Sequence, residues 1–144
     1  MKAQTQVNLG LITAGILFIA GIYSLVFWQH SVQSIIKWFF SPHIALCLIY
    51  IFALVRKKLR TAQVVYYIFW FTAGLIVLGL SSFLAIAHVS RPGIALRGRL
   101  EGAIVVLLWY WLPYGNIVLL LRMGLKGLEQ VIQTEHPQTS KNSK

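Results

Sequence analysis

Four long apolar runs separated by short polar segments dominate the chain. Residues 9–28, 41–55, 64–87 and 102–121 contain no Asp, Glu, Lys or Arg. About 20 helical residues cross a hydrocarbon layer of roughly 30 Å, so each run predicts a membrane helix. The predicted bounds are about 7–29, 41–59, 64–88 and 102–121. The pattern predicts an all-α polytopic membrane protein, a four-transmembrane-helix bundle in which residues 1–133 form a single domain.

The densest charge cluster joins the second and third runs, where Arg56, Lys57, Lys58 and Arg60 lie within five residues. Cytoplasmic loops carry an excess of Lys and Arg, so this cluster is predicted to be cytoplasmic and to determine the topology. Four crossings then leave nine Lys and Arg residues on that side and four on the other. The count predicts both termini in the cytoplasm and favours a bacterial cytoplasmic (inner) membrane, with an organellar inner membrane as the alternative.

Two segments near the apolar runs carry local signals. Ser41 and Pro42 predict a helix start, since Ser caps helix N-termini and Pro is tolerated in the first turn. The alternative is one longer helix kinked at Pro42. After Arg122, apolar residues at helical spacing predict a short amphipathic C-terminal helix at about 122–133 on the inner membrane surface. The polar residues 134–144 predict a disordered cytoplasmic tail.

The apolar composition supports the membrane interpretation, and it changes how the net positive charge is interpreted. The 144 residues are 58% hydrophobic and 11% charged, which is more apolar than soluble domains usually are. A net charge of +10 would suggest a nucleic-acid partner in a soluble protein. Here the basic residues lie at helix ends, so we expect no nucleic acid but contact with membrane lipids, including anionic head groups.

Few residues offer catalytic or metal-binding chemistry. Cys47 is the single cysteine, and Asp and Glu together number three. No paired metal ligands, cofactor fingerprint or carboxylate pair is present, so no catalytic residue, metal or cofactor is predicted. His43 and His88 fall at different depths by residue count, which disfavours a shared haem.

Small residues gather on one face of the first and third predicted helices. The first set is Gly10, Thr13, Ala14, Leu17, Gly21 and Ser24, and the second is Tyr67, Gly74, Leu78, Ser81, Ala85 and His88. Small residues let helix backbones approach closely in lipid. Both faces predict helix packing; for the first, the alternatives are a seam inside the chain and a homodimer seam.

The fourth run has an unusual polar centre. Pro113 cannot donate to the carbonyl of Trp109, and Asn116 adds a carboxamide on the same face. On the second helix His43 and Tyr50 share a face. These residues are predicted to form a ligand-binding or packing locus: Trp109, Pro113, Asn116, His43 and Tyr50. Either another helix satisfies its polar groups, for instance through Tyr50 or Ser81, or a quinone-like or lipid-like ligand does.

Three arginines, Arg91, Arg97 and Arg99, lie on the predicted outer side, against the expected charge bias. Guanidinium groups bind carboxylates and phosphates in bidentate fashion. The three arginines are therefore predicted to bind a partner or an anion, ranked as partner subunit, lipid phosphate and substrate. Pairing with Glu101 within the chain is the alternative.

These observations favour a small inner-membrane protein that acts by interaction with another membrane protein or with itself, as an accessory subunit, assembly factor or immunity-like inhibitor. The first alternative is a small oligomeric transporter or lipid-handling protein. The second is a membrane-embedded enzyme acting on an amphipathic anionic substrate, which the scarcity of acidic residues disfavours.

Overall fold

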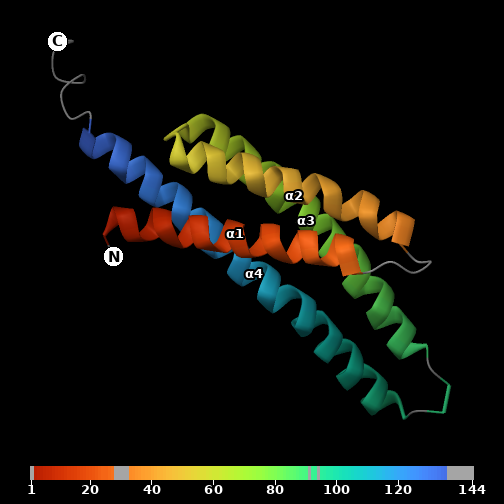
Figure 1. Cartoon of the computed structure of the whole chain (residues 1–144). Coiled ribbons are helices and arrows are strands. Elements are labelled where there is room, and N and C mark those ends of the chain that lie inside the picture. Colours follow the sequence, from red (N-terminus) through yellow and green to blue (C-terminus); the bar gives the residue numbers. More distant parts are fainter. Residues whose placement is uncertain (1, 28–32, 91, 94, 136–144) are drawn as a thin grey trace. The chain divides into compact units, whose positions relative to one another are not determined.

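The computed structural model describes residues 2–27, 33–90, 92, 93 and 95–135. Its elements are four α-helices, α1 (Ala3–Phe27), α2 (Gln33–Val55), α3 (Leu59–Val89) and α4 (Leu96–Glu135) (Figure 1). Every regular element within these residues is helical, so the all-α prediction is confirmed. The end of the first predicted helix at residue 29 and the tail from residue 136 lie outside the described residues.

Three of the helices are long and apolar enough to cross a membrane. These segments are Ala3–Val26, Leu59–Val89 and Leu96–Glu135, and α2 contributes a shorter apolar segment, Pro42–Val55. Large apolar side chains such as Ile19 and Phe83 are about two-thirds exposed. Exposed apolar surface on this scale is costly in water but not in hydrocarbon. The chain is therefore a helical membrane protein.

Several helix boundaries differ from the sequence-based prediction: α2 ends at Val55 rather than about residue 59, α3 begins at Leu59 rather than about 64, and α4 begins at Leu96 rather than about 102. The structure begins α2 at Gln33 and places Pro42 inside it, which is the longer-helix alternative. Residues 122–133 are not a separate helix but continue α4, which is 40 residues long. No proline follows Pro113 before residue 135, so nothing in this segment breaks the backbone hydrogen bonding.

The helices form two compact units. Unit 1 comprises Met1–Ile68 and Leu119–Lys144, and unit 2 comprises Phe69–Val118. Unit 1 therefore holds α1, α2, the start of α3 and the end of α4. Unit 2 holds the remainder of α3 and α4, joined by the connection between Val89 and Leu96.

Glycines in unit 1 allow α1 to pack closely against the end of α4 (Figure 1). A Cβ atom on Gly10 would lie 2.7 Å from the Cα of Gly124, and one on Gly127 would lie 2.6 Å from the carbonyl oxygen of Ala3. Only residues without a Cβ allow two backbones to approach this closely. The predicted small-residue face of α1 is thus used inside the chain, where Gly10, Thr13 and Ala14 are buried.

Burial of the last part of α4 overturns one expectation. Leu125 and Leu128, predicted to rest on the membrane surface, are buried within unit 1. The same unit buries Tyr50 of α2, whose hydroxyl donates a hydrogen bond to the carbonyl oxygen of Leu121 at 2.6 Å. The apolar stripe of an amphipathic helix can pack on lipid or on protein, and here the glycine contact supplies the protein.

The basic cluster forms a tight turn between α2 and α3. Lys58 N donates to Ala53 O at 2.8 Å and Lys57 N donates to Leu54 O at 3.2 Å. This pair of bonds is the Schellman arrangement, which requires a left-handed residue at the position after the helix cap. Lys57 has that conformation, with a φ of 53°. The turn lies where the sequence predicted a connection, at residues 56–58.

Unit 2 is a hairpin of two antiparallel helices with side chains fitted over glycines. The Tyr114 hydroxyl would lie 2.8 Å from a Cβ on Gly74, and it donates to the carbonyl oxygen of Trp70 at 2.7 Å. Nearer the connection, the His88 ring lies over Gly102, 2.7 Å from where its Cβ would be. Ser81, which lies between Gly74 and His88 in the sequence, is fully buried. The small residues of α3 therefore serve the contact with α4.

Candidate functional site

The predicted polar locus is divided between the two units. His43 and Tyr50 belong to unit 1, whereas Trp109, Pro113 and Asn116 belong to unit 2. His43 is half-buried, and the hydroxyl of Tyr50 donates to Leu121 O. The two sets are accordingly considered separately.

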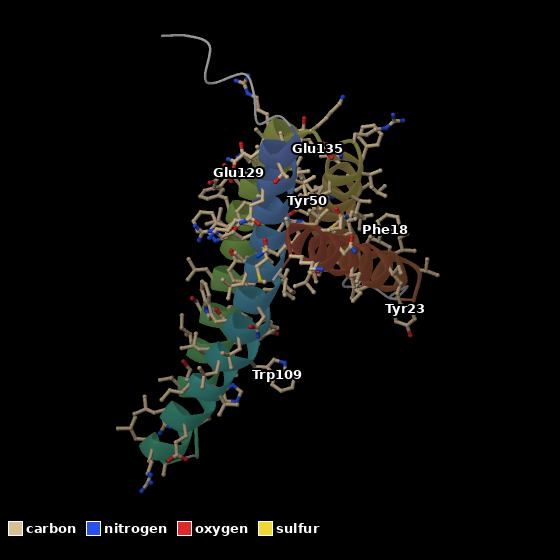
Figure 2. All side chains as sticks on the ribbon, turned by 90° about the vertical axis from the view of Figure 1, so that its left-hand side faces the viewer. Phe18, Tyr23, Tyr50, Trp109, Glu129 and Glu135 are labelled. Carbon is tan, nitrogen blue, oxygen red and sulfur yellow. The ribbon has the colours of Figure 1, made fainter. Side chains whose placement is uncertain are left out.

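The unit 2 part of the locus faces outward from the hairpin. Trp109 is 77% exposed and projects away from the helices of its unit (Figure 2). Pro113 and Asn116 are also exposed, and a Cβ on Gly115 would meet no atom within 4 Å. This side of α4 is therefore open to whatever surrounds unit 2.

Asn116 has no hydrogen-bond partner among the described residues. Of the two hydroxyls suggested from the sequence, Tyr50 donates to Leu121 O, and Ser81 donates to Leu78 O of its own helix at 3.3 Å. The carboxamide carries two donor hydrogens and an acceptor oxygen. A partner for it must come from outside unit 2.

The exposed side of α4 follows a regular spacing, in which Leu112 joins the face predicted to carry Trp109 and Asn116. Val105, Trp109, Leu112 and Asn116 are separated by four, three and four residues, and we call them the outer seam of α4. Val105 is 61% exposed and Leu112 is 62% exposed. Spacing of this kind places all four side chains within about one-sixth of the helix circumference. The spacing is visible in the sequence, but only the position of α3 shows which side of α4 is open.

Two of the three arginines that were predicted to lie on the outer side make contacts near the start of α4. Arg97 Nε and Glu101 Oε1 form an exposed ion pair at 2.9 Å, and Arg99 Nη1 donates to the carbonyl oxygen of Val89 at 3.3 Å. The pairing with Glu101 left open by the sequence is thus present for Arg97. The structure places Arg97 and Arg99 in the first turns of α4 rather than in a loop, and Arg91 lies outside the described residues.

The four cations that were predicted to determine the topology lie together on unit 1 and are all exposed. Lys57 forms an ion pair with Glu135 at the end of α4. Arg56 and Lys58 lie 5.5 and 6.0 Å from the centre of the Phe52 ring, within the range of cation–π contact. Arg60 is exposed in the first turn of α3. The four cations therefore gather at one end of unit 1.

The described residues bring together no group of three or more His, Cys, Asp or Glu side chains able to hold a metal ion. Cys47 is buried on α2. Neither observation assigns metal-binding or catalytic chemistry to a described residue.

Comparison with known protein families, with curated proteins and with solved structures found no match to this chain. The exposed side of α4, on which Asn116 lies among apolar residues, is the feature of the described residues that points to a function.

Proposed function

We propose that this chain is a small integral membrane protein that acts by binding another membrane protein chain, foreign or a copy of itself, through the outer seam of α4. Its role is that of an accessory subunit, assembly factor or inhibitor in a bacterial inner membrane. The observation that carries the proposal is the exposed Asn116, which no described residue satisfies.

The position of Asn116 makes its exposure costly in the absence of a partner. It follows Glu101 by fifteen residues and precedes Arg122 by six, inside a run without charged residues. An unsatisfied polar group in hydrocarbon costs several kcal/mol by order of magnitude, about 2–7 for an amide transferred without a hydrogen bond. A docked helix that supplies a hydrogen bond removes this cost.

The neighbours of Asn116 suit a helix as the bound element. Gly115 leaves open space beside the carboxamide, so a second backbone can approach closely. Leu112 and Trp109 provide large apolar surface one and two turns away, respectively. Small, polar and bulky apolar residues in this arrangement are typical of contacts between membrane helices.

The proposal includes four crossings with both termini in the cytoplasm. The 23 residues of α2 would extend about 34 Å, enough to cross a hydrocarbon layer, although its apolar segment is shorter. The cations at 56–60 support a cytoplasmic connection between α2 and α3. Accessibility of single cysteines at Lys57 and Gly93 to an impermeant thiol reagent tests this part, because the two positions should label from opposite sides.

Site-specific photocrosslinking in native membranes tests the proposal. Benzoylphenylalanine replaces Leu112 on the outer seam or, as the control, Leu107, which lies about 140° round the same helix. We expect a discrete adduct with a protein chain from position 112, much less from position 107, and loss of the adduct with Asn116→Leu. Adducts with lipid only, or equal adducts from both positions, would contradict the proposal.

A further inference from the structure

The outer seam of α4 carries one group that restricts what can cover it. Val105, Trp109 and Leu112 are apolar, and lipid satisfies them as well as protein does. Asn116 differs, because lipid chains neither donate nor accept hydrogen bonds. The covering surface must therefore supply a polar group at the depth of Asn116.

The spacing of the outer seam is that of a coiled-coil heptad. With separations of four, three and four residues, Trp109 and Asn116 take a positions, and Val105 and Leu112 take d positions. A single Asn at an a position is a known determinant of register and strand number in coiled coils, because two carboxamides bond to each other across the seam. Membrane helices pack with the same left-handed geometry.

A second copy of the chain supplies both a polar group at the depth of Asn116 and a helix with the same heptad spacing. Two copies inserted in one membrane with the same topology present α4 in the same direction. In a parallel pair each a residue faces the same a residue at equal depth. A carboxamide both donates and accepts, so Asn116 is its own complement, whereas a foreign helix needs a polar residue at a matching depth.

We infer that the helix covering the outer seam is α4 of a second copy, in a parallel two-fold dimer whose Asn116 side chains hydrogen-bond to each other. The inference rests on the proposed function, since it uses the same seam, and it narrows the partner to a second copy. Gly115 lies beside the contact, where its lack of a side chain permits close approach of the two helices.

Disulfide crosslinking of the purified full chain in lipid vesicles tests the inference. Cys47→Ala removes the single native cysteine, and Leu112→Cys then places a thiol at a d position of the seam. Leu107→Cys is the matched control, because it lies close in depth but on another side of α4. We expect a mild oxidant to link Leu112→Cys chains into dimers several times faster than Leu107→Cys chains.

Substitution of Asn116 tests the hydrogen bond itself in the same vesicles. Asn116→Leu should weaken dimerisation about 3- to 20-fold, the range expected for one interhelical polar contact. Asn116→Gln retains the carboxamide and should dimerise more strongly than Asn116→Leu. Because Asn116 is exposed, neither substitution should disturb the hairpin, and circular dichroism of the vesicles serves as the check on folding.

The outcomes separate this inference from the proposed function. Equal crosslinking from positions 107 and 112, or no effect of Asn116→Leu, overturns the second copy as partner. If the purified chain stays monomeric while position 112 still crosslinks to a foreign chain in native membranes, the dimer is overturned and the proposed function stands. If position 112 finds no protein in either setting, both fail.

Discussion

Unit 1 and unit 2 differ in the closest contact that their glycines make: unit 1 contains a contact between two backbones, whereas the close contacts of unit 2 are with side chains. In unit 1 Gly10, Gly124 and Gly127 bring two backbones together, and apolar residues such as Leu128 are buried around them. In unit 2 Gly74 and Gly102 receive side chains of the facing helix, while Gly115 faces open space. Unit 1 is thus held by a backbone contact, whereas unit 2 leaves the side of α4 around Gly115 open, where we propose that a partner binds.

The two units also differ in the burial of a polar group, the hydroxyl of Tyr50 in unit 1 and the carboxamide of Asn116 in unit 2. The hydroxyl of Tyr50 in unit 1 is buried and bonded to a backbone carbonyl, so it stabilises the fold. Asn116 in unit 2 is exposed, and the described residues give it no bond. Tyr50 therefore uses its polar group within the fold of unit 1, whereas the carboxamide of Asn116 in unit 2 remains available for a hydrogen bond.

The largest expected effect is in the glycine contact of unit 1. Gly10→Ala should destabilise the chain by about 1–3 kcal/mol or more, because its Cβ would meet the backbone of Gly124, which cannot move aside locally. The measurement is the midpoint of denaturation in mild detergent. Gly15→Ala is the control on the same helix, with no atom within 4 Å of its Cβ, and it should be neutral or stabilising. Equal effects of the two substitutions would show that the backbone contact is not formed.

A smaller loss is expected from the buried hydroxyl of unit 1. Tyr50→Phe removes its bond to Leu121 O and should lower the free energy of unfolding by about 1 kcal/mol. Tyr67→Phe is the control, since Tyr67 is 63% exposed on α3, and it should change stability very little. If Tyr67→Phe cost as much as Tyr50→Phe, the contrast between buried and available polar groups would not hold.

An added Cβ should destabilise the Tyr114 contact of unit 2 less than the glycine contact of unit 1. Gly74→Ala should cost less than Gly10→Ala, about 1 kcal/mol, because the Tyr114 hydroxyl at the end of a side chain can move away. The cost should fall further in a Tyr114→Phe background, since the bond to Trp70 O is then already absent. Strict additivity of the two changes would show that Tyr114 does not lie over Gly74.

The smallest effect concerns the basic turn. Lys57→Gly should be more stable than Lys57→Ala by about 1 kcal/mol, because the left-handed conformation at φ 53° costs nothing for glycine. Both substitutions remove the ion pair with Glu135, so the comparison isolates the backbone. Thermal denaturation of the two variants provides the measurement. A more stable alanine variant would contradict the turn geometry.

The sequence predicted the helical class and the position of the basic turn, because charges are excluded from long apolar runs. It did not decide where α2 begins, since Ser41 and Pro42 are compatible both with a helix start and with a helix interior. It also could not show that Leu125 and Leu128 are buried on protein, because an apolar stripe suits lipid equally well.

The candidate site was predictable in its residues but not in its orientation. Trp109 and Asn116 stand out in the sequence as polar or amphipathic groups within an apolar run. Which residues surround them depends on the side of α4 that α3 covers, and both sides of the helix are apolar. The contact of Tyr114 with Trp70 and Gly74 of α3 fixes that side, because Tyr114 lies on the face of α4 opposite the outer seam.

The most direct test of the central claim compares lipid access at two positions of α4 in native membranes. In the free chain Leu112 is 62% exposed and Leu107 is 37% exposed. Spin labels on single cysteines at these positions, in the Cys47→Ala background, report collision with oxygen dissolved in the lipid. A partner on the outer seam predicts less collision at 112 than at 107, with the order restored by Asn116→Leu. Greater collision at 112 from the outset would show that lipid alone covers the seam and would contradict the account.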